Sequence, residues 1–435
     1  MGKWIRSRGF GLTSRDFEAH ADEDADGEAG AMMELPLAAS RAGGLPGLAL
    51  QFGSWRGYKK DMKSACLTCG LVLLVVQWGV QSVCYAQQAG APGAAAKSDS
   101  APPATRAPAA RRGGGRGGAP ITAVEQAEIA PLAELPAWKA GADDGNYSIG
   151  PDYAPCKEMT PRDGVPVGKV ASFTLNAADS KFYPPTGLRG ANATRKVTVY
   201  IPAQYKAGTA APFIVSCDAY GSGRRQLPNI LDNMIHDKRL PVMIAVMVAN
   251  GGGDGRGSER GLEYDTVSGK YAEFVEAEIL PRVEKEYGVT LTKDPDARMT
   301  LGGSSGGAAA FTMAWFHPEL YHRVLCYSGT FVNQQSGPDA PHGAWSYHEQ
   351  IIANSAVKPI RVWLHVSERD NGAGSSGAGL HNWVLANKRM ADVLKAKGYH
   401  YQLVYAKGAG HTDGKVIAQT YPQALEWVWS GYGGK

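Results

Sequence analysis

The stretch Met299-Thr-Leu-Gly-Gly-Ser-Ser-Gly-Gly-Ala-Ala-Ala-Phe311 decides how this chain folds. It starts as a short apolar run, passes through a turn with four glycines and continues into small and apolar residues that predict a buried helix. Small residues two before and two after a serine let a strand and the following helix approach closely, with the serine on the sharp turn between them. No Gly-Lys-Ser/Thr follows, so the pattern is not that of a phosphate-binding loop.

Two registers of a Gly-x-Ser-x-Gly pattern fit this turn. The first places Ser304 at its centre and the second places Ser305 there. Local sterics allow either serine to be a nucleophile, and a glycine turn with a purely structural role is the simpler alternative. The choice therefore depends on partner residues elsewhere in the chain.

Short β-branched runs alternate with amphipathic stretches from about residue 163 onward, which indicates an α/β sandwich with a mostly parallel sheet. Two early strands are arranged as a hairpin. The predicted helices are 271–287 and 383–397, the latter with Gly398 as its C-cap. The predicted strands are 169–175, 197–201, 213–215, 242–248, 299–301, 324–327, 362–366 and 403–405.

Residues 62–86 have the layout of a secretory signal, with a basic start, a short apolar core and small residues at the end. A buried helix is the alternative, but the Ala-, Gly- and Pro-rich residues 87–120 predict a linker and offer nothing to pack against. We therefore expect Met62 to be the biological start and the protein to be secreted or periplasmic. Residues 1–61 are then a non-native or mis-started extension, and residues 121–162 form an arm on the folded domain.

The composition excludes several classes of protein. The 435 residues carry 45 Lys and Arg against 41 Asp and Glu, a net charge of +4 that is too mild to indicate a nucleic-acid partner. No apolar run reaches the roughly 18 residues of a membrane span. After the signal, no spacing of Cys or His matches a zinc site, so we expect no metal and at most one disulfide there. Three cysteines remain to form it, Cys156, Cys217 and Cys326.

A nucleophilic serine needs a base that takes its proton and an acid that orients the base, in the chain order Ser, Asp/Glu, His for such a fold. The predicted base is His411, in the glycine-rich loop 408–414 after the last strand. Glu368 and Asp370 both follow the preceding strand, and we choose Asp370 as the acid. Asp413 is too close to His411 along the loop to orient it.

Attack on a carbonyl develops an oxyanion, which two N–H groups must stabilise. If Ser304 is the nucleophile, the first donor is the backbone N–H of Ser305. The second should come from the loop after strand 213–215, where Asp218 and Ala219 are the candidates. Cys217 lacks a matching His motif and is interpreted as a packing residue.

With these residues in place, the chain resembles the enterochelin esterase-like branch of the esterase D family, which includes feruloyl and acetylxylan esterases and S-formylglutathione hydrolases. In that family a His-Pro or Trp-Pro pair has its proline fourteen residues after the nucleophile, and counting back from Pro318 selects Ser304. The resemblance covers most of residues 163–433. Its motifs are Gly-Gly-Ser304-Ser-Gly-Gly, His317-Pro-Glu319, Ser328-Gly329, Asp370 and Gly410-His411.

The resemblance implies that residues 163–435 are one α/β-hydrolase catalytic domain, a three-layer sandwich. It also implies a serine carboxylic ester hydrolase that acts through an acyl-enzyme without a cofactor. An acyltransferase of the same fold and a non-catalytic carbohydrate-binding relative are the alternatives. The chain departs from many relatives at Asp218-Ala219, where they have Asp-Gly, which leaves the second oxyanion donor open. The amino-terminal β-sandwich of true enterochelin esterases has no room here, so no siderophore substrate is implied.

The sequence holds few indications of the substrate. Arg260 and Glu263, and Trp383 in His381-Asn-Trp383, lie in tracts that border or support the active site in the family that the chain resembles. An insertion after Ser328-Gly329 contains the other candidates, His342, Trp345 and Tyr347, as an aromatic wall for an acyl or sugar group. Core packing of Trp345 is the alternative. We expect a small-molecule or polysaccharide-linked ester of the acetyl or feruloyl type, and the oligomeric state stays open.

Overall fold

The computed structural model describes residues 118–188, 190–219 and 226–433. The predicted extension 1–61, the predicted signal 62–86 and nearly all of the predicted linker 87–120 lie outside these residues. Within the described ranges, no helix combines the length and the apolar character needed to cross a membrane.

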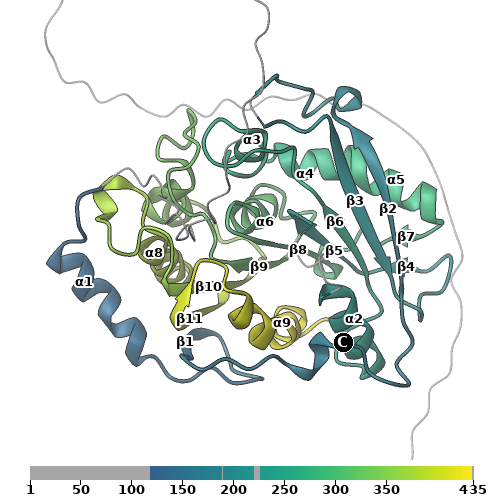
Figure 1. The fold of residues 1–435 in the computed structure, drawn as a ribbon, viewed down its shortest axis with the longest axis horizontal. Helices are drawn as coiled ribbons and strands as arrows, with labels where there is room; N and C mark the ends of the chain where they lie inside the picture. Colours follow the sequence, from purple (N-terminus) through teal and green to yellow (C-terminus); the bar gives the residue numbers. More distant parts are fainter. Residues whose placement is uncertain (1–117, 189, 220–225, 434–435) are drawn as a thin grey trace, which may run out of the picture. The chain divides into compact units, whose positions relative to one another are not determined.

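A nine-stranded sheet forms the centre of the fold (Figure 1), with the strand order β1-β11-β10-β9-β8-β5-β6-β3-β2. β3 pairs antiparallel with β2 and β6, and all other neighbours in this sheet are parallel. The predicted, mostly parallel sheet with an early hairpin is therefore confirmed. Its strands are β1 (Gly145–Ile149), β2 (Lys169–Asn176), β3 (Thr194–Ile201), β5 (Phe213–Cys217), β6 (Ile244–Val248), β8 (Arg298–Gly303), β9 (Arg323–Tyr327), β10 (Arg361–Arg369) and β11 (His400–Gly410), and a separate parallel pair joins β4 (Ala210–Ala211) to β7 (Thr290–Leu291).

Helices cover both faces of the sheet, as the sandwich prediction requires (Figure 1). The predicted helix 271–287 is one continuous segment in which a π-helical turn, Val275–Ile279, joins α4 to α5. One face carries α2 (Gln226–His236) and α9 (Gly414–Trp429), and the other carries α3 (Glu259–Tyr264), α4 (Lys270–Phe274), α5 (Leu280–Tyr287), α6 (Ser305–Phe316) and α8 (Trp383–Ala396). Shorter helical segments are α1 (Ala123–Ile129), α7 (Ile352–Asn354), a second π turn at Tyr347–Ile351 and 3-10 turns at Ala130–Glu134, Lys157–Met159, Ala177–Asp179, Pro295–Ala297, Gly343–Trp345 and Gly377–Gly379.

Two hydrophobic cores lie on the two faces of the sheet. Successive side chains of a strand point to opposite faces, so each central strand contributes to both cores. In β5, Phe213 and Val215 pack in the core under α6, whereas Ile214 packs in the core under α2 and α9. All five residues of β5 are buried. This burial on both faces explains why continuous apolar runs predicted the central strands correctly.

Residues 121–162 contribute a strand that the sequence did not predict. β1 pairs in parallel with β11 from Gly145↔Gln402 to Ile149↔Ala406 and becomes one edge of the sheet. Its sequence Gly-Asn-Tyr-Ser-Ile is short and mixed in polarity, so it lacks the apolar run that indicates a strand. The sheet therefore begins before residue 163, where the catalytic domain was expected to start.

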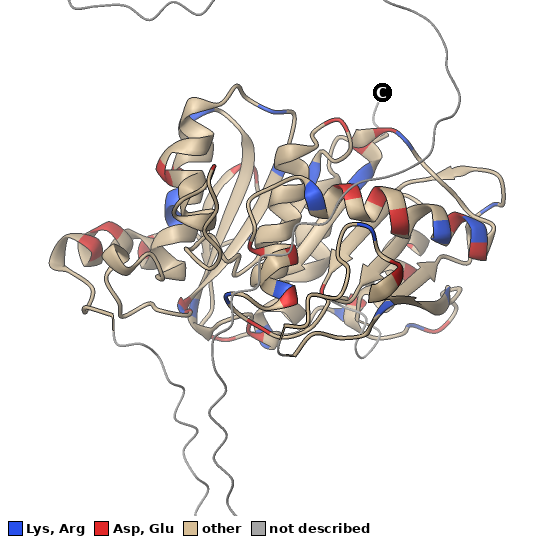
Figure 2. Cartoon of the chain, turned by 90° about the horizontal axis from the view of Figure 1, so that it is seen from above, with Lys and Arg blue, Asp and Glu red and all other residues tan. Residues whose placement is uncertain are grey.

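Charged residues of both signs are interspersed along the helices and loops (Figure 2). This distribution agrees with the nearly balanced totals of 45 basic and 41 acidic residues. Several pairs of opposite charge are in contact, among them Arg239 with Glu426 and Arg389 with Glu128.

A buried carboxyl group lies at the end of α3. Asp265 is only 1% exposed, and neither of its carboxylate oxygens has a hydrogen-bond partner among the described residues. Burial raises its pKa to about 7, although the hydroxyl of Ser305, which lies near the carboxylate without forming a hydrogen bond of standard geometry, and the charge of Arg260 partly counteract this effect. Because an unpaired buried carboxylate is costly, the group holds its proton well above the pH at which an exposed aspartate loses it.

We predict that Asp265→Asn stabilises the protein more at pH 8 than at pH 5. The native state keeps this proton while the unfolded state releases it near pH 4, so native stability falls as the pH rises towards 7. Asparagine does not titrate, and the gain in unfolding free energy should be roughly 2 kcal/mol larger at pH 8. Urea unfolding of the full chain at both pH values measures this difference.

Asp392→Asn is the matched control for this measurement. The Asp392 side chain is 49% exposed on α8 and contacts Lys388, so its effect should change little between pH 5 and pH 8. An equal effect of Asp265→Asn at both pH values would show that Asp265 is ionised in the native state throughout this range.

Candidate active site

The glycine turn of the quoted stretch forms a sharp connection between β8 and α6. A Cβ atom on Gly302 would lie 2.2 Å from the carbonyl oxygen of Gly306, and one on Gly306 would lie 3.2 Å from the Cβ atom of Cys217. Glycine at 302 therefore permits the strand and the helix to approach this closely, and at 306 a Cβ atom would crowd the end of β5. Ser304 occupies the turn itself with φ 56° and ψ −129°, a conformation that is rare for a residue with a side chain.

The two serines of this turn differ in their surroundings. Ser304 is partly exposed, its N–H donates to the carbonyl oxygen of Tyr327 at 2.9 Å, and its side chain faces the loop after β11. Ser305 is 2% exposed and is the first residue of α6. Of the two predicted registers, the geometry presents the hydroxyl of Ser304 and buries that of Ser305.

Ser304, His411 and Asp370 form a continuous hydrogen-bonded series, which we call the triad. Ser304 Oγ lies 2.9 Å from His411 Nε2, and His411 Nδ1 lies 2.6 Å from Asp370 Oδ1. The three residues come from the carboxyl ends of β8, β10 and β11, which are parallel and therefore reach the same edge of the sheet. Residues more than 100 positions apart are brought together in this way.

Asp370 is held as an acceptor from several sides. Its oxygens accept hydrogen bonds from the Ser328 hydroxyl at 2.7 Å and from the N–H groups of Ser367 and Asn371 at 3.1 and 2.8 Å. Burial opposes ionisation, but the contact with His411 and these hydrogen bonds outweigh it and lower the pKa of Asp370. An ionised Asp370 makes His411 Nδ1 the donor, so Nε2 is left to accept the proton of Ser304.

The other candidate acids and bases have different surroundings. Glu368 accepts a hydrogen bond from the N–H of Gly408, and Asp413 caps the N-terminus of α9 through the N–H of Lys415. His365 is fully buried within β10, and burial lowers its pKa to about 4, so its ring is neutral at physiological pH.

The predicted oxyanion donors are only partly available. Ser305 N–H lies at the start of α6, where no earlier carbonyl of the helix can accept from it. The N–H of Asp218 donates instead to Tyr264 Oη, and that of Ala219 donates to the carbonyl oxygen of Val248, both at 2.8 Å. Neither candidate for the second donor is free in this structure, and residues 220–225, which follow, lie outside the described residues.

Arg260 and Glu263 support the backbone around this loop. Arg260 pairs with the Asp218 carboxylate through Nε and Nη2, the latter at 2.6 Å. Glu263 is 2% exposed, forms an ion pair with Arg195 and accepts from the N–H of Gly251 at 2.8 Å. Their observed contacts are thus with the protein, although both were predicted as substrate-binding residues.

The three residues of the predicted aromatic wall do not lie together: Trp345 and Tyr347 are buried, and His342 is at the surface. Tyr347 is fully buried and donates its hydroxyl hydrogen to Thr312 at 2.8 Å, and Trp345 is 4% exposed. A cavity of about 480 Å³ beside Trp345 is lined by residues of α8 and the second π turn, and no triad residue lines it. His342 is exposed and contacts Glu349. Trp345 therefore packs in the core, as its alternative interpretation states, and Tyr347 does so too.

Trp383 does lie beside the triad, together with a residue that the sequence analysis missed. The Trp383 ring is 8% exposed, and its centroid lies 6.0 Å from that of His411. Its Nε1–H donates to the hydroxyl of Thr330 at 3.3 Å, and this hydroxyl also lies 3.3 Å from Ser304 Oγ. The position of Thr330, two residues after Ser328 at the end of β9, is the sequence signal that could have identified it.

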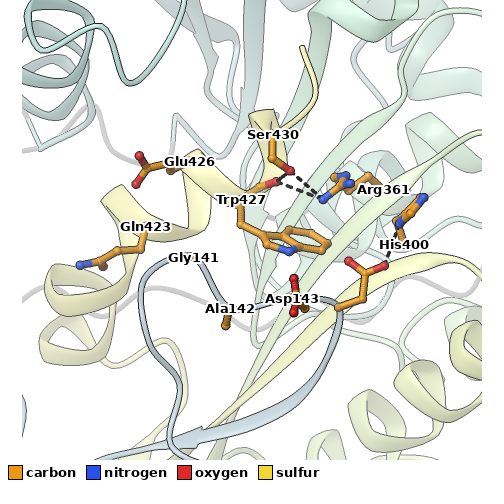
Figure 3. Close-up of a pocket in the computed structure, with 10 residues that line it drawn as sticks. Gly141, Ala142, Asp143, Arg361, His400, Gln423, Glu426, Trp427 and Ser430 are labelled. Atoms are coloured by element: carbon orange, nitrogen blue, oxygen red, sulfur yellow. Dashed lines mark hydrogen bonds and ion pairs between the residues drawn. The ribbon is translucent and has the colours of Figure 1, made fainter. Parts of the chain in front are cut away.

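A separate cavity of about 610 Å³ lies at the opposite, amino-terminal end of β10 and β11 (Figure 3). Its polar groups are largely paired with one another. Arg361 donates to the carbonyl oxygen of Trp427 and to Ser430 Oγ, and His400 pairs with Asp144. No triad residue lines this cavity, so it is distinct from the candidate active site.

The three cysteines expected after the predicted signal are all free thiols. Cys156 is partly exposed, whereas Cys217 and Cys326 are buried. Burial raises the pKa of both buried thiols, so neither is present as a reactive thiolate near neutral pH. The interpretation of Cys217 as a packing residue agrees with this environment.

Comparison with known proteins identifies several relatives. The uncharacterized protein YbbA of Bacillus subtilis (strain 168) is 22% identical over 250 residues, which cover 54% of this chain and 92% of that protein. A ferulic acid esterase of Anaeromyces mucronatus has a TM-score of 0.47 and 14% identity, with 64% of this chain and 96% of that chain covered. The enterobactin esterase FES of Shigella flexneri has a TM-score of 0.45 and 16% identity, with 63% and 62% covered.

A family model described as "Putative esterase" matches residues 190–419. The match runs from the residues before β3 to the middle of α9 and includes the glycine turn, the end of β10 and the loop that carries His411. Because it spans more than half of the 435 residues, this chain belongs to the Putative esterase family.

Proposed function

We propose that the protein is a secreted or periplasmic serine carboxylic ester hydrolase that acts through an acyl-enzyme. The observation that carries this proposal is the hydrogen-bonded series from Ser304 Oγ through His411 to Asp370 at the carboxyl edge of the sheet. Membership of an esterase family supports the same reaction class. Secretion rests on the predicted signal at residues 62–86.

The proposed mechanism gives each of these residues one role in the reaction. His411 Nε2 takes the proton of Ser304 while Oγ attacks the ester carbonyl, and it then gives that proton to the departing alcohol oxygen. Asp370 holds the ring in the required tautomer and stabilises the imidazolium that forms. The N–H of Ser305, at the positive end of the α6 dipole, is directed at the developing oxyanion. A water molecule then attacks the acyl-enzyme with His411 again as the base, which releases the carboxylic acid and restores Ser304.

We predict that Ser304→Ala lowers kcat/KM for p-nitrophenyl acetate by at least about 1000-fold, because it removes the hydroxyl that is proposed to form the acyl-enzyme. Ser305→Ala retains its backbone N–H and should keep activity within about tenfold. Release of p-nitrophenol by the purified full chain measures both. Full activity of Ser304→Ala together with an inactive Ser305→Ala would assign the nucleophile to the other register.

We predict that Asp370→Asn lowers kcat for p-nitrophenyl acetate by about 10,000-fold, since an amide no longer enforces the tautomer that accepts the Ser304 proton. Initial rates of p-nitrophenol release by the purified full chain measure this loss. A variant that keeps the activity of the wild type would exclude Asp370 as the residue that orients His411.

We predict that the natural substrate is a carbohydrate-linked or aromatic ester. A panel of acetyl, feruloyl and glucuronoyl esters, with a lactone for comparison, should give kcat/KM values at least about tenfold higher for one of the first two classes than for a simple alkyl ester.

Partition of the acyl group between water and added alcohol separates a hydrolase from an acyltransferase. Failure of a fluorophosphonate probe to label the protein would indicate a non-catalytic relative.

A further inference from the structure

The nucleophile has a second polar neighbour besides His411. Thr330 Oγ1 lies 3.3 Å from Ser304 Oγ, and the N–H of Thr330 donates to the carbonyl oxygen of Ser304 at 3.1 Å. Thr330 is fully buried, and its hydroxyl also receives the indole N–H of Trp383 at 3.3 Å. The side chains of Trp383, Thr330 and Ser304 thus form a relay that ends at the triad.

The direction of every hydrogen bond in this relay can be derived from its two ends. The indole N–H of Trp383 can only donate, and an ionised Asp370 can only accept. Because Ser304 gives its proton to His411 Nε2, it must accept from Thr330. The Thr330 hydroxyl accepts from Trp383, so its own hydrogen is free to point at Ser304 Oγ.

The backbone around Thr330 is held rigidly enough to define this geometry. Asn387 of α8 is fully buried and donates through Nδ2 to the carbonyl oxygens of Gly329 and Trp383, both at 2.9 Å. This side chain ties the end of β9 to the start of α8. Trp383 begins α8, and Thr330 lies three residues after β9 in a buried segment that the Asn387 side chain holds against this helix.

We propose that Thr330 is a positioning residue of the hydrolase, oriented by Trp383, which donates a hydrogen bond to Ser304 Oγ as negative charge develops there. This inference rests on the proposed function. The bond is long in the resting enzyme, and a hydrogen bond to a charged acceptor is shorter and stronger than one to a neutral hydroxyl. An interaction that strengthens in the transition state raises the rate without tightening substrate binding.

The protons balance without a contribution from Thr330. In acylation the Oγ–carbon bond forms while the Ser304 proton passes to His411 Nε2, and this proton then leaves on the alcohol as the bond between the carbonyl carbon and the alcohol oxygen breaks. In deacylation the water oxygen bonds to the acyl carbon while a water proton passes to Nε2, and this proton then returns to Oγ as the bond between Oγ and the acyl carbon breaks. Thr330 keeps its own proton throughout, so its effect is on the stability of the Oγ charge in both steps.

The test compares Thr330→Val with Thr330→Ser. Valine keeps the shape and the backbone N–H but removes the hydroxyl, so kcat for p-nitrophenyl acetate and the rate of fluorophosphonate labelling should fall roughly 10- to 100-fold with KM nearly unchanged. Serine restores the donor and should stay within about threefold of the wild type. Thr312→Val is the matched control, because its buried hydroxyl contacts Tyr347 and not Ser304.

A double-mutant cycle tests the orienting role of Trp383. Trp383→Phe keeps a ring against His411 but removes the indole N–H, and it should lower kcat roughly three- to tenfold. Added to Thr330→Val, it should cause little further loss, because the hydroxyl that it orients is already absent. If the fold-losses in kcat of the two single variants multiply in the double variant, the two residues act independently and the relay is wrong.

The outcomes separate the two proposals. If Ser304→Ala retains activity, the proposed function fails and the relay fails with it. If Ser304→Ala is inactive while Thr330→Val keeps its kcat, only the relay is wrong. Should Thr330→Val not fold, judged by circular dichroism, Trp383→Phe decides alone, and an unchanged kcat and labelling rate would overturn the proposal.

Discussion

The close approach of β8 and α6 is the constraint on which the site depends. Gly302 and Gly306 meet backbone to backbone, and any Cβ atom at Gly302 would collide with the carbonyl of Gly306. This contact forces Ser304 into a conformation that residues with side chains seldom adopt. The strain is offset by hydrogen bonds to both ends of the residue, from its N–H to Tyr327 and from Thr330 to its carbonyl oxygen. The turn therefore presents one hydroxyl and buries the next.

The parallel strands then supply the partners of that hydroxyl. The strands that lead to Asp370 and His411 are adjacent and parallel, so these two residues, 41 positions apart in the chain, meet at the carboxyl ends of the strands. Ser328 and Thr330 are fully buried and bond to Asp370 and Ser304, and the buried Asn387 bonds to the backbone carbonyl of Gly329 between them. The site is thus built by packed strand and helix ends, and its precision depends on the core beneath it.

The sequence was sufficient to predict the elements that have strong local patterns. Short β-branched runs, continuous and apolar in the later strands, identified eight of the strands, and the glycine turn together with Asp370 and His411 identified the residues that the structure brings together. It was insufficient where a role depends on a distant neighbour. β1 is a strand because it pairs with the outer side of β11. Trp345 and Tyr347 are core residues because α6 and α8 cover them. The N–H groups of Asp218 and Ala219 donate to Tyr264 and Val248. None of these contacts leaves a local signature.

The pairing of β1 with β11 has a consequence for where the protein can be divided. β11 ends one residue before His411, and β1 covers its outer side. A chain trimmed to begin at residue 163, where the composition changes, would expose a long apolar strand with a row of unpaired backbone groups. Such edges add strands from other molecules and lead to aggregation. The short, weakly patterned segment at residues 145–149 therefore protects the half of the sheet that carries the histidine from self-association.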